Sequence, residues 1–302
     1  MLMVVLTHCI VPYQSERWVG YYWIFIMTFT MPLFTIISGF WYKKRAFGKN
    51  VKQLLYPCIL FSIINFTVGY KYYQTIYGEI KFLNLGYAMW YLWALFIYYC
   101  ITPYLLKRVN VKVLIVLSIV LAMIVGVIPF VGGKLQLSRV ICFYPFFLIG
   151  IFLREKFSDL CYSEKYHKVG WTVMILSVVI YIILQSYKPG IVFHTGFTTG
   201  YSLSLLGGLS RLFTYMICIA MSIAMIVIMP NKELWFSKYG TRTMNVYLLH
   251  MCIVFPLCWY ISEPFRNDLS AYILSLLIVP LLCCLLFSKP VDSFMKKVLF
   301  KV

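Results

Sequence analysis

Long stretches without a single charged residue dominate this chain and constrain its fold more than any other feature. Most of them reach the ~20 residues that a helix needs to cross a hydrocarbon core about 30 Å thick. These runs cover residues 18–42, 53–70, 82–106, 113–133, 140–153, 169–187, 212–231, 243–262 and 269–288. Such a pattern predicts a protein that folds in lipid rather than in water.

The composition excludes several classes of protein. Of 302 residues, 62% are hydrophobic and 12% are charged, whereas soluble domains carry roughly 45–50% apolar and about 25% charged residues. A soluble enzyme, a disordered chain and a nucleic-acid-binding domain are therefore excluded, and no nucleic acid is expected as a partner.

The predicted fold is a single all-α transmembrane domain over residues 1–302, with about ten helices. Only helices and closed barrels cross lipid, and uncharged runs this long lack the alternation of a barrel strand. Residues 1–11 form the first helix, which looks truncated. We expect Arg139 to lie inside the span that contains 140–153. Residues 189–210 are expected to form an outer loop or re-entrant piece that leads into a helix at about 205–229.

The positive charges predict the orientation of the chain in the membrane. Nineteen of the 27 Lys and Arg residues fall in alternate loops and at the C-terminal end, all on one predicted side, and eight fall elsewhere. Basic residues are enriched on the cytoplasmic side of membrane proteins. We therefore expect a multi-pass protein of the cell membrane with both termini in the cytoplasm, and topology explains most of the net charge of +18.

Polar groups at membrane depth are the candidates for chemistry, because burying them there is costly. No Asp or Glu lies within any predicted span, which weakens an ion-coupled transporter. The remaining candidates are His8, Arg139, Arg211 and His250. Each also has a structural interpretation: a membrane histidine can hydrogen-bond a neighbouring helix, and the two arginines begin their spans and can extend to the outer headgroups.

Several short motifs lie in order along nearly the whole chain. They are Leu6-Thr7-His8, Met31-Pro32-Leu33-Phe34, Ser38-Gly39-Phe40, Trp90 to Leu95, Arg139 with Phe143 to Gly150, Tyr239-Gly240 and Tyr247-Leu248-Leu249-His250. Each motif alone is weak, but together, and in this order, they resemble the membrane acyltransferase 3 family, with its fucose 4-O-acetylase-like branch as the nearest type.

The resemblance implies transfer of an acyl group from acyl-CoA to a hydroxyl, usually on a sugar of an exported glycan. His8 matches the family's essential histidine and is expected to act as general base, because a positioned imidazole can take the proton of a weakly nucleophilic hydroxyl. Arg139, Ser38 and His250 are candidates for oxyanion stabilisation or substrate binding. We expect no metal and no bound cofactor, with acyl-CoA, acetyl-CoA in particular, as co-substrate and lipid and glycan as partners.

A basic cluster follows the second predicted span, at the place of the family's paired arginines. It consists of Lys43, Lys44, Arg45, Lys49 and Lys52. One interpretation is docking of the CoA phosphates, for which lysine acts as a point charge rather than as a bidentate fork. The other is a topology determinant attracted to anionic lipid. The sequence leaves both open.

Two departures from the family pattern support other hypotheses. The family's arginine eleven positions before the histidine would fall before Met1, and Thr30 stands where the branch often has a second histidine. We therefore also consider an inactive truncated paralogue. A transporter or flippase of a lipid-linked glycan is the remaining alternative.

Overall fold

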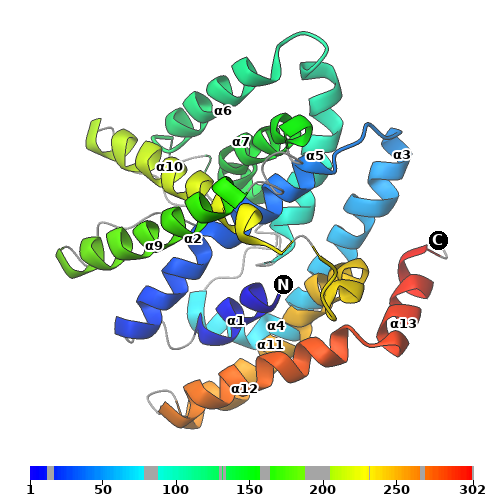
Figure 1. Ribbon diagram of the computed structural model, residues 1–302. Coiled ribbons are helices and arrows are strands. Elements are labelled where there is room, and N and C mark those ends of the chain that lie inside the picture. Colours follow the sequence, from blue (N-terminus) through cyan, green and yellow to red (C-terminus); the bar gives the residue numbers. More distant parts are fainter. Residues whose placement is uncertain are drawn as a thin grey trace. The chain divides into compact units, whose positions relative to one another are not determined.

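The computed structural model describes residues 1–11, 17–77, 88–128, 131, 134–156, 164–187, 205–230, 232–265 and 269–300. Every regular element in these ranges is helical (Figure 1), which confirms the predicted all-α class. The outer loop or re-entrant piece expected from residue 189 onward lies outside the described residues up to residue 204. The helix predicted to follow it is present and begins at Leu205.

All of the longer helices except α13 overlap the uncharged runs or the first apolar segment, residues 1–11. The longer helices are α1 Leu2–Ile10, α2 Arg17–Phe40, α4 Tyr56–Tyr77, α5 Trp90–Leu105, α6 Val111–Val125, α7 Leu137–Leu153, α9 Glu164–Tyr187, α10 Leu205–Ile228, α11 Thr243–Phe265, α12 Leu269–Leu286 and α13 Lys289–Phe300. Shorter helical turns are α3 Phe47–Asn50, η2 Val51–Leu55, η5 Lys134–Gln136, η6 Arg154–Lys156 and η7 Ser237–Arg242. Arg139 lies inside helix α7, and the expectation that this helix spans the membrane stays a prediction.

Three helical stretches within the described residues are long and apolar enough to cross a membrane. They are Val19–Phe40, Phe47–Lys71 and Arg211–Ile228. A fourth is reached if Leu276–Leu286 and Lys289–Leu299, which meet at a bend of 62°, are counted as one broken span. The apolar helices agree with a membrane protein, and the number of about ten spans stays a prediction.

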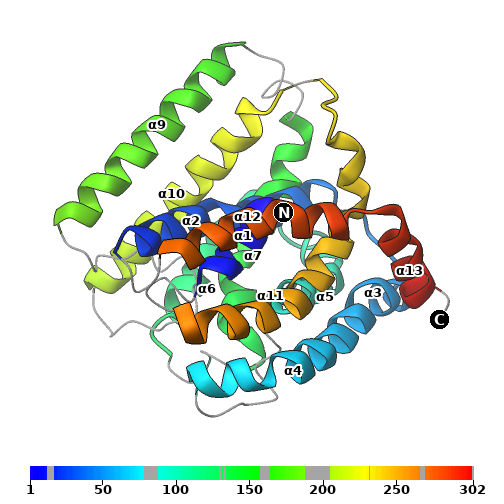
Figure 2. The same ribbon diagram turned by 90° about the horizontal axis from the view of Figure 1, so that it is seen from below.

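The chain divides into two compact units, which are described separately. Unit 1 contains Met1–Trp23, Val51–Trp93 and Glu233–Val302, and unit 2 contains Ile24–Asn50 and Ala94–Lys232. In unit 1, the short helix α1 packs against α11 and α12, and α11 also packs against α4 (Figure 2). Helices from both ends of the chain therefore meet around α1.

Unit 2 contains an unusually close approach between α2 and α7. A Cβ atom added to Gly39 would overlap the carbonyl oxygen of Phe147, and one added to Gly150 would overlap that of Ile36 and lie 2.7 Å from the backbone nitrogen of Phe40. Only glycine therefore fits at either position without movement of a backbone. The two glycines belong to two motifs of the family resemblance, and their packing role explains the residue type.

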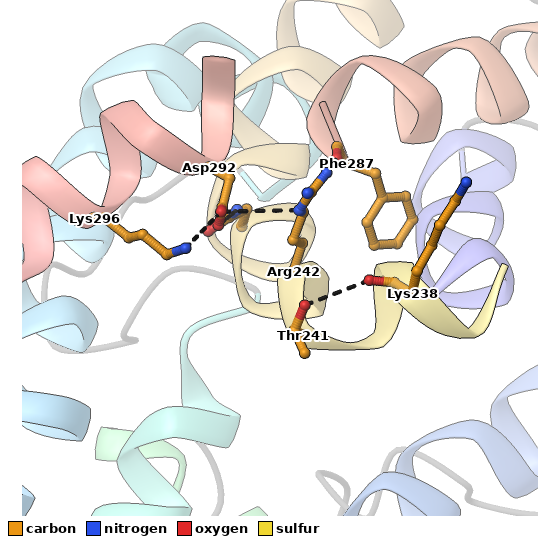
Figure 3. Close-up of polar contacts among 7 residues, drawn as sticks. Lys238, Thr241, Arg242, Phe287, Asp292 and Lys296 are labelled. Carbon is orange, nitrogen blue, oxygen red and sulfur yellow. Dashed lines mark hydrogen bonds and ion pairs between the residues drawn. The ribbon is translucent and has the colours of Figure 1, made fainter. Parts of the chain in front are cut away.

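The C-terminal helix α13 was not predicted from the uncharged runs, because it carries several charges. It is tied to the preceding elements of unit 1 by Asp292 (Figure 3). One oxygen of Asp292 accepts a hydrogen bond from Lys296 at 2.8 Å and lies 3.8 Å from Nε of Arg242. Its other oxygen accepts from Asn245 at 3.0 Å. The hydrogen bonds from Lys296 and Asn245 hold the pKa of this carboxyl below its ordinary value.

Candidate active site

The two histidines singled out in the sequence lie against each other in unit 1. His8 is half-buried on α1, and its ring centroid is 5.2 Å from that of His250 on α11, with the ring planes tilted by 43°. The two positions are far apart in the sequence and meet because α1 packs against α11. A half-buried imidazole can accept a proton from a hydroxyl that reaches it.

His250 is completely buried and is held by the backbone of its own helix. Its Nδ1 lies 2.9 Å from the carbonyl oxygen of Val246 and 2.8 Å from that of Tyr247. Its Nε2 is buried as well and has no hydrogen-bond partner among the described residues. The ring is therefore fixed at one nitrogen and available at the other.

Tyr247, one turn before His250, fixes this part of α11 to the segment that leads into α5. Its hydroxyl donates a hydrogen bond to the carbonyl oxygen of Ala88. Its ring centroid lies 5.9 Å from that of Tyr91 and 6.3 Å from that of His250. The Tyr-x-x-His motif thus combines a packing residue with a site residue, and two of the motifs of the resemblance are in direct contact.

Asn65 is a buried polar residue that the sequence analysis did not single out. It lies on α4, is 1% exposed and accepts a hydrogen bond from the thiol of Cys252 at 3.1 Å. Cys252 is two residues beyond His250 on α11, so this contact holds α4 against the helix that carries the buried histidine. An amide in the middle of the apolar run 53–70 was the signal that could have identified it.

Arg211 lies in the interior of unit 2 and does not extend toward a surface. Only 4% of it is exposed, and its Nη1 donates to the carbonyl oxygen of Ala122 at 3.0 Å and to Sγ of Cys142 at 3.4 Å. The hydroxyl of Tyr215, one turn further along α10, donates to the carbonyl oxygen of Cys142 at 2.7 Å. Arg211 thus joins α10 to α6 and α7.

The other two substrate-binding candidates, Arg139 and Ser38, are half-buried residues of unit 2. Arg139 lies in the first turn of α7. This helix begins directly after Leu135 and Gln136, whose φ angles of 52° and 54° are left-handed and unfavourable for residues with side chains. Ser38 precedes Gly39 at the close approach of α2 and α7. Neither residue belongs to the unit that holds the two histidines.

The basic cluster is mostly open to solvent or headgroups. Lys43, Lys44, Lys49 and Lys52 are exposed. Arg45 differs, because it is half-buried and its guanidinium lies 4.8 Å from the centroid of the Tyr99 ring. Four exposed ammonium groups within residues 43–52 can attract a phosphate group or an anionic lipid surface equally well, so the structure keeps both interpretations.

Comparison with known proteins identifies the family. The family model Acyl_transf_3, described as an acyltransferase domain, matches residues 1–289, which is nearly the whole chain. Neither the curated proteins nor the solved structures give a match. The family match, together with the apolar helices, shows that the protein belongs to the membrane acyltransferase 3 family and is a membrane acyltransferase.

Proposed function

We propose that the protein transfers an acetyl group from cytoplasmic acetyl-CoA to a sugar hydroxyl of an exported or cell-surface polysaccharide, with His8 as the general base. The membrane acyltransferase family supplies the reaction class. The observation that carries the role of His8 is its position: a half-buried imidazole that contacts a second, fully buried imidazole.

The reaction requires one proton acceptor and one stabiliser of negative charge. The sugar oxygen forms a bond to the thioester carbonyl carbon while His8 takes the hydroxyl proton. The tetrahedral intermediate then breaks its C–S bond, and the departing thiolate of CoA takes the proton from His8. The developing oxyanion needs a cation or a hydrogen-bond donor close by, and Arg139 and Ser38 are the candidates that the family resemblance offers for this role.

The donor substrate is expected to enter from the cytoplasmic side. The cluster Lys43, Lys44, Arg45, Lys49 and Lys52 supplies the positive charge that would hold the CoA phosphates, and four of its members are exposed. The predicted orientation puts His8 in the outer half of the membrane. The pantetheine arm would therefore pass between helices to present its acetyl group near the outer face.

The test uses the full chain in proteoliposomes of known orientation with radiolabelled acetyl-CoA on the inner face. The acceptor, added on the outer face, is surface polysaccharide from the cells in which the protein naturally occurs, after its ester groups have been removed with alkali. Wild type should form alkali-labile acetyl ester, and His8→Ala should lower the rate by about 10²- to 10⁴-fold, the usual contribution of a general base, while the protein remains monodisperse in detergent.

Three results would contradict the proposal. Undiminished ester formation by His8→Ala would remove His8 from the chemistry. A requirement for acetyl-CoA on the outer face would contradict the route of the donor. Movement of the glycan across the membrane without acetyl-CoA, and without ester formation by wild type, would support a transporter instead.

A further inference from the structure

The tautomer of His250 follows from its two backbone contacts. A carbonyl oxygen only accepts hydrogen bonds, and Nδ1 lies 2.9 Å from the oxygen of Val246 and 2.8 Å from that of Tyr247. Nδ1 therefore carries the proton and donates to one or both oxygens. In the neutral ring, Nε2 then has a lone pair and can only accept.

That lone pair is buried and has no donor among the described residues. A buried acceptor without a hydrogen bond is unfavourable, and proteins usually satisfy such groups. The orphaned Nε2 therefore points to a donor that arrives when the site is in use. Because the backbone holds the other nitrogen, the ring cannot flip to satisfy Nε2 without losing both contacts at Nδ1.

His8 is the neighbour from which that donor would come. The two ring centroids are 5.2 Å apart, and the tilt of 43° between the planes rules out a stacked pair. At this separation, two imidazoles turned edge to edge bring one nitrogen of each within hydrogen-bond distance. His8 is half-buried, whereas His250 is fully buried and held by two backbone carbonyl oxygens.

We propose that His250 is a positioning residue for His8: its Nε2 accepts a hydrogen bond from an N–H of His8 and orients the opposite nitrogen of His8 toward the acceptor hydroxyl. The inference rests on the proposed role of His8 as general base. It goes beyond that role by giving His250 a fixed tautomer and a defined partner.

The protons balance with His250 unchanged throughout the reaction. Before the reaction, one nitrogen of His8 donates to Nε2 of His250, and the other accepts from the sugar hydroxyl. As the C–O bond forms, the hydroxyl proton moves to His8, which becomes an imidazolium held by His250. When the C–S bond breaks, this proton passes to the thiolate of CoA. A hydrogen bond from a charged donor is stronger than one from a neutral donor, so His250 stabilises the transition state more than the resting state.

Two substitutions distinguish the contribution of Nε2 of His250 from that of Nδ1. Glutamine places its carbonyl oxygen near the position of Nε2, whereas asparagine reaches only as far as Nδ1. We expect His250→Asn to lower kcat by about 10- to 100-fold, the value of one hydrogen bond to a charged group. The KM for acetyl-CoA should stay within about twofold. His250→Gln should keep kcat within about fivefold of wild type.

Met251→Leu is the matched control, because this neighbouring residue of α11 is 2% exposed and the change conserves volume. It should leave kcat and KM near those of wild type. Equal losses in His250→Asn and His250→Gln, no loss in either, or an increase in the KM for acetyl-CoA with kcat unchanged would each overturn the proposal.

A measurement on wild type keeps the inference testable even if the variants at position 250 do not fold. The chain has four histidines, so ¹⁵N-histidine labelling gives few signals, and variants of the other three assign them. We expect the His250 signals of a neutral ring with a protonated Nδ1 and an unprotonated Nε2. A protonated Nε2 would overturn the proposal.

The result for His8→Ala distinguishes the two proposals. If His8→Ala retains full activity, the proposed function of His8 fails, whatever the His250 variants do. If His8→Ala is inactive but His250→Asn is as active as wild type, His8 keeps its role and the positioning role of His250 fails.

Discussion

Arg211 shows how one residue can be ambiguous in the sequence and unambiguous in the structure. At the start of an apolar run, an arginine can extend to the headgroups or turn inward with its charge. Its contacts with the carbonyl oxygen of Ala122 and the thiol of Cys142 show that it turns inward. A buried cation that hydrogen-bonds two other helices stabilises their arrangement. Its removal takes away the packing of its side chain and leaves the buried groups that it contacts without their hydrogen-bond donor.

We therefore expect Arg211→Ala to destabilise the protein by about 1.5–3 kcal/mol, the value of hydrogen bonds that involve a charged group. The midpoint of thermal unfolding in detergent measures the effect. Arg108→Ala is the control, because Arg108 is exposed and such changes usually stay within about 0.5 kcal/mol. Equal midpoints for the two variants would mean that the contacts of Arg211 contribute nothing to stability.

His8 and His250 show the same contrast at the site. The sequence indicates both residues, because polar groups in apolar runs are rare and costly. It does not indicate that their rings meet, that Nδ1 of His250 faces two carbonyl oxygens, or that Nε2 is left without a partner among the described residues. Those facts depend on how α1 packs against α11 and on one side-chain rotamer.

Among the helices, the crossing of α2 and α7 depends on two glycines. The sequence analysis recorded Gly39 and Gly150 as parts of family motifs and gave them no physical role. The structure gives them one, because each lets the backbone of its helix touch that of the other. Close backbone approach through small residues is a common way for helices to associate in lipid.

We expect Gly150→Ala to destabilise unit 2 by about 1–3 kcal/mol, the usual cost of forcing extra volume into a packed site. The obstacle is backbone rather than a movable side chain. Gly48→Ala is the control, because nothing lies within 4 Å of a Cβ atom at Gly48, and its effect should be neutral or slightly stabilising. Limited proteolysis or thermal unfolding in detergent compares the two. If Gly150→Ala has the same unfolding midpoint and the same rate of proteolysis as wild type, α2 and α7 can move apart at little cost in free energy.

Helix α13 is the element that the hydropathy pattern missed. Scanning for uncharged runs identifies helices that lie in lipid, and α13 contains Lys289, Asp292, Lys296 and Lys297. What fixes it is a polar contact rather than an apolar run: Asp292 links Arg242 and Asn245 to Lys296. The contacts with Arg242 and Asn245 depend on tertiary structure and leave no periodic signal in the sequence, whereas Asp292 and Lys296 form an i,i+4 pair within α13.

At the scale of the whole molecule, the uneven distribution of positive charge predicts the orientation and, under the proposed function, would supply the surface that binds CoA. The same lysines can serve both purposes, since attraction to anionic lipid and to a phosphate group has one physical origin. Kinetics separates the two, because only docking of CoA changes the apparent affinity for that substrate.

We expect the double variant Lys49→Gln and Lys52→Gln to raise the KM for acetyl-CoA by about 3- to 20-fold with kcat nearly unchanged. Each exposed charge contributes up to about 1 kcal/mol. The control is Lys165→Gln with Lys168→Gln, two exposed lysines at the start of α9 on the same predicted side. A similar change in both variants would indicate a general charge effect, and no change in either would leave the cluster as a topology determinant only.

The sequence by itself determined the helical class, the membrane environment, the family motifs and the identity of the two histidines. These properties depend on the local hydropathy and charge of the chain, which do not change with packing. Only the tertiary structure decided that His8 lies against His250, that Arg211 turns inward and that two glycines join α2 to α7. Each of these depends on contacts between helices distant in sequence, and no pattern along the chain records which helix faces which.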